Sequence, residues 1–182
     1  MSNNPAFELL SNIRDKAREL STQNLSFAAQ AAGTKYIAYS VNGVNFYSNA
    51  LDIKEVSVCE NLMVVPQTKR WMRGLVNSKG TLYSVSDLSL VAGYDQPTSV
   101  KNGHLLLVSD EASQSALLVS RVIGFRYFEE QERMTDLDEH QETLDGLSTF
   151  VGEAFTADGS EWFNLDVKKL LEAEQFLSLI HI

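Results

Sequence analysis

The sequence predicts a mainly β protein in which two similar small barrels pack against each other. Three observations support this fold class. From Lys35 onward apolar and polar residues alternate over short segments, tight-turn signals separate these segments, and a four-residue pattern recurs 79 positions further along the chain. Only brief helical segments lie between the predicted strands, which favours small barrels over a sheet built from βαβ units.

Length and composition are those of one globular domain or of two small subdomains that share a core. The chain has 182 residues, of which 44% are hydrophobic and 21% are charged. Its longest apolar runs, such as Leu105–Val108, are too short to span a bilayer, so we expect no direct membrane insertion. No secretory signal is visible, and Cys59, the single cysteine, cannot form an intrachain disulfide. A cytoplasmic location is therefore predicted.

The charge is strongly acidic and unevenly distributed. A formal charge of -9, from 24 acidic and 15 basic residues, opposes binding to phosphate backbones, so nucleic acid is not an expected partner. The range Lys69–Lys79 nevertheless holds four basic residues and no acid, whereas Glu129–Asp145 holds eight acids and one basic residue. One interpretation is that both runs are solvated faces of the protein. The alternative is that the basic run forms a docking surface.

A helix is predicted near the N-terminus, over about Pro5–Leu20. Asn4 is a suitable N-cap, and the fixed φ of Pro5 suits the first helical position. The apolar residues of this segment follow one stripe, at Ala6, Leu10, Ile13, Ala17 and Leu20. The stripe either covers the domain's own core or docks on a partner, and residues 21–34 are expected to form a linker or an irregular arm.

The predicted strands begin with a hairpin. Lys35–Val41 and Val44–Ser48 are joined by Asn42-Gly43, a strong signal for a two-residue turn. Further short strands are predicted over Ile53–Val58, Leu62–Val65, Gly74–Val76, Leu82–Val85, Leu105–Val108 and Ala116–Val122. Pro66 ends the strand that precedes it, because proline cannot donate a hydrogen bond to a β-ladder.

The repeated pattern is a glycine followed by an aromatic residue, an aspartate and an apolar residue at fixed spacings. It occurs at Gly80, Tyr83, Asp87 and Leu88, and again at Gly159, Trp162, Asp166 and Val167. In each copy a glycine turn leads into a strand, and the aspartate is placed to cap a short helix, Leu88–Val91 or Val167–Leu171. We interpret the pattern as two similar β-subdomains, with chance agreement as the alternative.

Residues with matched catalytic or metal-binding roles do not occur together in the sequence. Cys59, His104 and Asp110 are the members of an imaginable thiol-protease-like set, but no motif surrounds Cys59, and a buried structural cysteine is the expected role. Neither His104 nor His140 has a second His or Cys at metal-ligand spacing, and the sequence contains no GxSxG, GxGxxG or Walker-type loop. We therefore expect no enzyme activity, no cofactor and no metal.

The segment Val65–Leu88 is the most specific feature of the sequence. It contains Val65-Pro66, then Trp71, then Gly74-Leu75-Val76-Asn77-Ser78-Lys79-Gly80, and finally an apolar strand that ends in Asp87-Leu88. This order resembles the signature of CheW-like domains, and the likeness extends from about Lys35 to Leu171. It implies two packed five-stranded SH3-like β-barrels with an N-terminal helix and a short C-terminal helix.

The resemblance also implies a domain organisation and a function. Residues 1–34 would be the N-terminal helix and linker, residues 35–176 a CheW-like domain of two interleaved barrel subdomains, and residues 177–182 a tail similar to translated sequencing-adaptor read-through. CheW proteins are non-catalytic adaptors that couple the helical tip of methyl-accepting chemoreceptors to the regulatory domain of a CheA-type histidine kinase. The opening Pro5–Leu10 segment is similar to PilI, the adaptor of the pathway that controls type IV pili and twitching motility. A flagellar chemotaxis adaptor is the alternative.

The receptor- and kinase-facing positions implied by the resemblance fall on several predicted elements. They are Glu55, Gly74, Asn77, Lys79 and Gly80, together with Val119, Val122 and Gly124 on a strand expected to line the groove between the barrels. Lys79 stands where the family commonly has arginine, so the charge is kept but the planar bidentate fork is lost. For the strand residues, plain core packing is the alternative.

The implied mechanism is scaffolding, in which a receptor's helical tip lies in the apolar groove between the barrels while a barrel end joins the kinase domain. A rival hypothesis from another class is a generic SH3-like module that binds a peptide or an oligonucleotide. The basic range Lys69–Lys79 and Trp71 are its support.

Overall fold

The computed structural model describes residues 34–109, 114–137 and 140–173. Apart from Thr34, these residues belong to the compact unit Lys35–Ile182. The helix predicted over Pro5–Leu20 and the tail at 177–182 lie outside the described residues, as does nearly all of the predicted linker.

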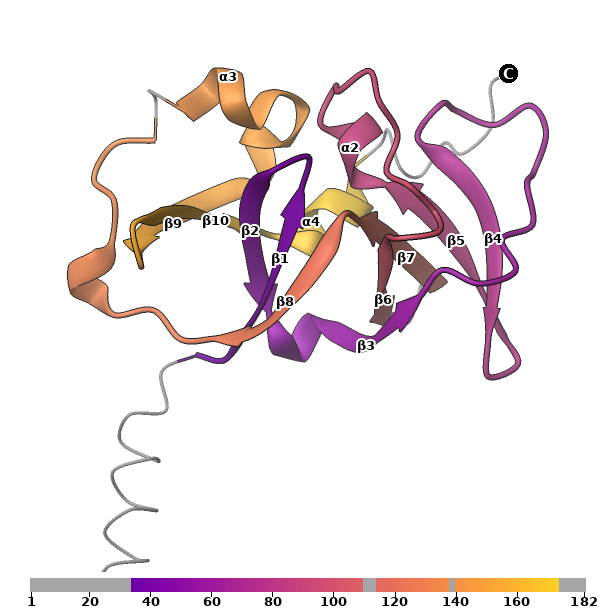
Figure 1. Ribbon diagram of the computed structural model, residues 1–182, viewed down its shortest axis with the longest axis horizontal. Helices are drawn as coiled ribbons and strands as arrows, with labels where there is room; N and C mark the ends of the chain where they lie inside the picture. The colour runs from indigo at the N-terminus through magenta and orange to yellow at the C-terminus, as the bar shows by residue number, and fades with distance from the viewer. Residues whose placement is uncertain (1–33, 110–113, 138–139, 174–182) are drawn as a thin grey trace, which may run out of the picture. The chain divides into compact units, whose positions relative to one another are not determined.

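The described chain is mainly β, with short helices between the strands (Figure 1). The strands are β1 Tyr36–Val41, β2 Val44–Asn49, β3 Ile53–Val58, β4 Met72–Ser78, β5 Thr81–Asp87, β6 His104–Ser109, β7 Gln114–Val119, β8 Arg121–Arg126, β9 Val151–Ala157 and β10 Ser160–Leu165. The α-helices are α2 Leu88–Val91, α3 Gln141–Leu144 and α4 Val167–Glu172, and the 3-10 turns are η1 Ala50–Asp52, η2 Glu130–Glu132 and η4 Asp145–Phe150. The predicted fold class is confirmed, with a short helix near the end of the described chain.

The strands form two five-stranded sheets with the same internal plan. The first sheet has the order β9-β10-β2-β1-β8, and the second has the order β4-β5-β7-β6-β3. Each begins with an antiparallel hairpin, continues through one parallel pair (β10 with β2, β5 with β7) and ends in an antiparallel edge strand. The first sheet therefore combines the indigo strands of Figure 1 with its orange and yellow ones, while the second is contributed by the middle of the chain.

The repeated sequence pattern occupies equivalent places in the two sheets. Lys79-Gly80 and Asp158-Gly159 form the hairpin turns, and all four residues have positive φ, of 51°, 86°, 52° and 69°. Two successive positive φ values are the requirement of a type I′ turn, which matches the twist of the flanking strands. The two aspartates cap the helices that follow: Asp87 Oδ1 accepts from the amide of Ser89, and Asp166 Oδ1 accepts from that of Lys169.

Apolar residues are buried both inside each sheet's curl and between the two sheets. The cluster between the sheets includes Ile37, Tyr39, Phe46, Phe163, Leu106, Val108, Leu117 and Val119. The second sheet encloses a cluster with Val85, Leu105, Leu107 and Leu118, and the first encloses one with Ala38, Tyr47, Phe155 and Trp162. Successive residues of β6 therefore alternate between two cores, which explains the unbroken apolar run Leu105–Val108.

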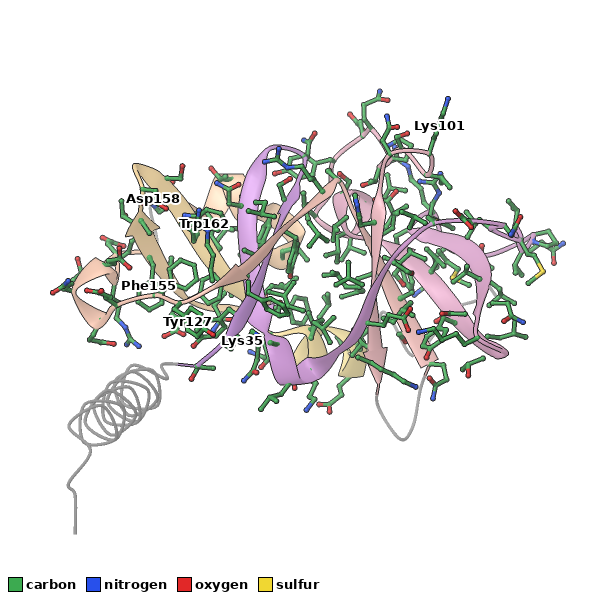
Figure 2. All side chains as sticks on the ribbon, turned by 60° about the horizontal axis from the view of Figure 1, so that its bottom comes forward. Lys35, Lys101, Tyr127, Phe155, Asp158 and Trp162 are labelled. Atoms are coloured by element: carbon green, nitrogen blue, oxygen red, sulfur yellow. The ribbon has the colours of Figure 1, made fainter. Side chains whose placement is uncertain are left out.

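Each sheet curls until its hairpin turn meets its opposite edge strand, which closes the sheet by side-chain contact. In the first sheet, Arg126 on β8 forms an ion pair of 2.7 Å with Asp158 in the β9–β10 turn, and its guanidinium lies 4.2 Å from the ring centroid of Trp162. Figure 2 shows Asp158 and Trp162 close together at one end of this sheet. In the second sheet, Lys79 in the β4–β5 turn forms an ion pair of 2.8 Å with Glu55 on β3, and Lys54 on β3 donates to Tyr83 Oη of β5 at 3.4 Å. Tyr83 and Trp162 are the equivalent aromatic residues of the repeat.

Two of the strand predictions were wrong. In place of a strand over Leu62–Val65, Met63 alone forms a bridge, to Leu75, and the positive φ of Asn61 and Gln67 bends the chain away on either side. In place of one strand over Ala116–Val122, the chain changes sheet at Ser120, so that β7 belongs to the second sheet and β8 to the first. Ser120 donates its amide to Ser40 of β1 and accepts from the amide of Asn42, which holds the crossing in place.

Candidate functional site: a groove between two edge strands

A largely apolar groove lies where the edge strands of the two sheets face each other. Its volume is about 370 Å³. On the side of the first sheet it is lined by Ile37, Val122, Gly124 and Phe125, and on the side of the second by Ile53, Lys54, Glu55 and Val56, with Ala50 between them. β8 and β3 are the corresponding edge strands of the two sheets. Residues of both strands line the groove, so it lies where the two sheets adjoin.

Both edge strands carry a β-bulge where they line the groove. On β3, Ile53 pairs with Val108 and Glu55 with Leu107, which leaves Lys54 as the extra residue. On β8, the pairing with β1 skips Ile123. Bulges bend a strand and interrupt its regular ladder, so these edges are poor templates for the addition of a further strand. The groove is instead suited to contact through side chains.

Gly124 keeps the floor of the groove open. Its φ is +132°, which L-residues rarely adopt, and a Cβ built at this position would have no atom within 4 Å. A side chain here would be strained by the backbone conformation rather than by a collision. Gly124, Val122 and Glu55 are therefore three predicted site residues that the structure brings together.

A second group of predicted residues forms one preorganised turn. Asn77 Oδ1 accepts a hydrogen bond of 2.9 Å from the amide of Gly80, so a side-chain contact across the turn stabilises its conformation. Lys79 Nζ lies 2.8 Å from Glu55 Oε2, so the turn is joined to the groove by an ion pair. The Lys79 side chain is 79% exposed, against 29% for that of Glu55. The lysine is therefore open to an incoming partner, while the carboxylate is largely covered.

The remaining two predicted site residues lie in the interior. Gly74 is buried with a φ of +141°, and a Cβ there would come 2.2 Å from the carbonyl oxygen of Met63. Met63 is held at this distance because it exchanges two backbone hydrogen bonds with Leu75, the residue next to Gly74. Val119 is fully buried in the core between the sheets. The alternative of core packing therefore accounts for Val119, and close backbone packing accounts for Gly74. Their role in binding stays a prediction.

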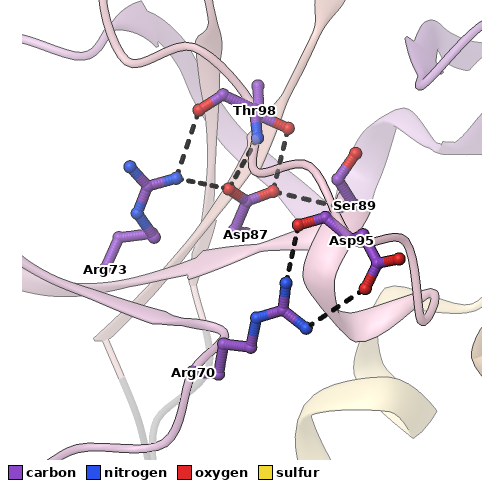
Figure 3. A network of polar contacts seen from close by, with 6 residues as sticks. All are labelled: Arg70, Arg73, Asp87, Ser89, Asp95 and Thr98. Atoms are coloured by element: carbon purple, nitrogen blue, oxygen red, sulfur yellow. Dashed lines mark hydrogen bonds and ion pairs between the residues drawn. The ribbon is translucent and has the colours of Figure 1, made fainter.

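Two arginines of the basic range Lys69–Lys79 contact other residues of the fold, Arg73 in a largely buried network and Arg70 at the surface (Figure 3). Arg73 Nη1 donates to the buried carboxylate of Asp87 at 2.6 Å and to the carbonyl of Thr98 at 3.1 Å. Asp87 also accepts from the amide and hydroxyl of Thr98, at 2.9 Å and 2.8 Å. Arg70 donates to the carbonyl of Asp95 at 2.6 Å. These contacts tie the loop after α2 to Arg73 on β4 and to Arg70 just before it, and Arg73 is the one of these two arginines that is largely withdrawn from the surface.

Cys59 and His140, two side chains considered for reactivity in the sequence, are packed against other residues of the fold. Cys59 is buried, and this burial raises the pKa of its thiol, against which the charge of Arg73 acts. His140 Nδ1 lies 3.5 Å from Glu161 Oε2, beside the ring of Phe163. Among the residues that the structure describes, no three His, Cys, Asp or Glu side chains are grouped so as to hold a metal ion.

Two features of the surface were missed in the sequence. Phe125 is 60% exposed and lines the groove, with the ammonium of Lys35 lying 3.7 Å from its ring centroid. A second set of exposed apolar side chains, here called the apolar end, consists of Val58 on β3, Met63 and Val64 in the segment between β3 and β4, and Leu82 on β5. An aromatic residue directly after Gly124, in a strand with arginine at both ends, was the available signal for Phe125.

Two curled five-stranded sheets that share a core and leave a groove between their edge strands define the class of double-barrel β modules. The family model for the CheW-like domain matches residues 35–175, and the chain belongs to this family. Its fold is similar to the crystal structure of the scaffolding protein TtCheW from Thermoanaerobacter tengcongensis, with a TM-score of 0.66 and 19% sequence identity. The match covers 79% of this chain and 90% of TtCheW. No curated protein sequence matches the chain.

Within the described ranges, no helix has the length and apolar character needed to cross a bilayer.

Proposed function

We propose that this protein is a non-catalytic adaptor that couples methyl-accepting chemoreceptors to a CheA-type histidine kinase. The observation that carries the proposal is the apolar groove between the bulged edge strands of a CheW-like domain. The description of TtCheW as a scaffolding protein supports the same class of function. The adaptor would act in the cytoplasm, where the tips of chemoreceptors and their kinases lie.

The groove suits a helix as its occupant. Its walls present Ile37, Val56, Val122 and Phe125, and an amphipathic helix binds such a surface by laying its apolar stripe along it. The bulges on β3 and β8 oppose the other common mode, in which a peptide adds to a sheet edge. A helical receptor tip is therefore the proposed ligand of the groove.

The apolar end is the proposed contact for the regulatory domain of the kinase. Val64 is 79% exposed, and Val58, Met63 and Leu82 are each about half exposed. They are contributed by β3, by the segment between β3 and β4, and by β5, and exposed apolar side chains of this size favour a protein interface. With receptor and kinase on separate surfaces, the adaptor transmits a signal if it binds one state of the kinase more tightly than the other.

The finer assignment is the pathway that controls type IV pili and twitching motility. It is supported by the likeness of the segment Pro5–Leu10 to PilI. This segment lies outside the described residues. A flagellar chemotaxis adaptor is the alternative. Deletion of the gene would separate the two: loss of twitching with normal swimming supports the first, and the reverse supports the second.

Two substitutions on β3 and the loop after it test the division of surfaces. Val56→Asp places a charge in the groove, and Val64→Asp places the same charge in the apolar end. We expect Val56→Asp to weaken binding of a chemoreceptor cytoplasmic fragment about tenfold or more, with little effect on the kinase regulatory domain, and Val64→Asp to do the reverse. Isothermal titration calorimetry with each partner measures both effects. Unchanged affinities in both variants would contradict the proposed surfaces.

A further inference from the structure

We propose that the groove selects an amphipathic helix with acidic side chains on both flanks of its apolar stripe, through Lys35 on one rim and Lys54 on the other. This inference rests on the proposed function, since it specifies the chemistry of the helix that the groove receives. It is carried by the placement of the two lysines and by the pairing of the acids near them.

Lys35 stands on the rim that belongs to the first sheet. Because side chains alternate along a strand, Lys35 shares a face with Ile37, which lines the groove and pairs with Phe125. Its ammonium lies over the exposed ring of Phe125, and it has no carboxylate within ion-pair distance among the described residues. Figure 2 shows Lys35 at the start of β1. The cation–π contact holds a positive charge at the mouth of the groove.

Lys54 stands on the opposite rim. It is the extra residue of the β3 bulge, it is exposed, and it lines the groove directly. Its ammonium donates to the hydroxyl of Tyr83, and no carboxylate of the described ranges pairs with it. The bulge thus places a lysine, rather than a further apolar side chain, among the residues that line the groove.

The acids near the groove already have cationic partners. Glu55 pairs with Lys79 at 2.8 Å, and Asp52 pairs with Lys168 at 2.7 Å. Among the residues that the structure describes, no carboxylate therefore pairs with Lys35 or Lys54 at the groove, although the whole chain carries a charge of -9. Complementary charge on a partner improves specificity and association rate, whereas like charge is penalised. A helix that places carboxylates beside both rims meets this requirement, and a basic one does not.

Three designed helical peptides test the inference against the full chain. They share one apolar stripe and differ only at the flanking positions, which are all Glu, all Gln or all Lys. Fluorescence anisotropy gives each dissociation constant. We expect the Glu peptide to bind roughly threefold to tenfold more tightly than the Gln peptide at low salt and the Lys peptide to bind most weakly. The preference should shrink as the salt concentration rises.

Charge reversal on the protein identifies the residues responsible. Lys35→Glu combined with Lys54→Glu should abolish or reverse the preference, while the double change to Arg should keep it. Lys101→Glu is the matched control, since Lys101 is an exposed lysine on the loop before β6, far from Lys35 in Figure 2. Equal affinity for the Glu and Gln peptides, or an effect of Lys101→Glu as large as that of the groove variants, would overturn the inference.

The groove variant Val56→Asp separates this inference from the proposed function. If all three peptides bind equally well and Val56→Asp weakens all of them, helix docking stands and the acid preference fails. If Val56→Asp changes no peptide's affinity, or if no peptide binds, the groove is not a helix site, and both proposals fail. Circular dichroism of each variant confirms that the compared proteins are folded.

Discussion

The ammonium of Lys79 and the carboxylate of Glu55 lie 2.8 Å apart and join the hairpin turn of the second sheet to its edge strand. The equivalent contact in the first sheet, between Asp158 and Arg126, has the charges exchanged. Each barrel is thus closed by an ion pair at the same place. Only the second of these pairs borders the groove, which places Lys79 where a partner bound at either the turn or the groove would meet it.

Lys79→Glu should reduce co-precipitation of receptor or kinase while leaving the fold intact. The change sets two carboxylates against each other at the turn, but the site is exposed, so the stability cost should stay below about 1 kcal/mol. Thermal denaturation checks the fold, and co-precipitation checks binding. The double variant Lys79→Glu with Glu55→Lys restores the pair with reversed polarity. Unchanged binding in Lys79→Glu would remove Lys79 from the proposed site.

Asp87→Ala should destabilise the protein far more than Asp166→Ala, although the two aspartates are equivalents in the repeat. Asp87 is fully buried and pairs with Arg73, and loss of one partner of a buried ion pair costs about 3–5 kcal/mol. Asp166 is exposed and acts as an N-cap, which contributes about 1 kcal/mol. Chemical denaturation of the two variants measures the difference. Equal costs would show that the Asp87 network adds nothing beyond its cap.

Gly74→Ala should cost more stability than Gly124→Ala, for a reason separate from φ. Both glycines have a φ that disfavours alanine, a strain of roughly 1–3 kcal/mol. Only at Gly74 does the added Cβ also collide with backbone, at the carbonyl of Met63. Denaturant unfolding gives both values. Comparable stability of the two variants would mean that the Met63 segment moves aside easily.

The stability of the fold should fall in alkali. Burial raises the pKa of Tyr39 above its ordinary value, and burial together with the charge of Glu153 raises the pKa of Tyr47. The folded protein therefore keeps both phenols protonated where the unfolded chain loses these protons, above about pH 10. This contribution is fully present below that pH and is lost as the pH rises further toward the folded pKa values.

Tyr39→Phe should reduce this loss, whereas Tyr127→Phe, at an exposed position, should not. The free energy of unfolding measured between about pH 8 and pH 11 tests the difference. At neutral pH Tyr39→Phe should cost about 1 kcal/mol, because its hydroxyl hydrogen-bonds to Ser48 Oγ at 2.8 Å. An identical alkaline slope in the two variants would contradict the assignment to Tyr39.

Much of the fold is predictable because it follows from local chemistry. The turns at Asn42-Gly43 and Lys79-Gly80 need two positive φ values, which the structure shows. Asparagine and glycine tolerate such values, and in the second turn the glycine alone carries this signal, although Lys79 also has a φ of 51°. The caps at Asp87 and Asp166 need an oxygen placed before a helical turn. The segment Leu62–Val65 has the apolar residues typical of a strand, but in the structure only Met63 pairs, through a single bridge to Leu75.

The candidate site is predictable only in part. The groove joins β8 and β3, whose equivalence becomes visible once the strand order of both sheets is known. Lys35 and Phe125 are distant in the sequence, and their contact depends on the pairing of β1 with β8. Arg73 was counted with a basic surface, because its charge can be read from the sequence but its buried partner, Asp87, cannot.

The sequence by itself determined most of the strands, the tight glycine turns and the aspartate caps, since each depends on residues within a few positions of one another, and a fixed spacing of 79 residues indicated the two similar β-subdomains. Tertiary structure alone decided that the chain changes sheet at Ser120, that Val119 is core while Val122 lines the groove, and that Lys79 meets Glu55. The physical reason is that alternation with a period of two identifies the two faces of a strand. It does not identify what covers each face, and here both faces of the central strands are buried.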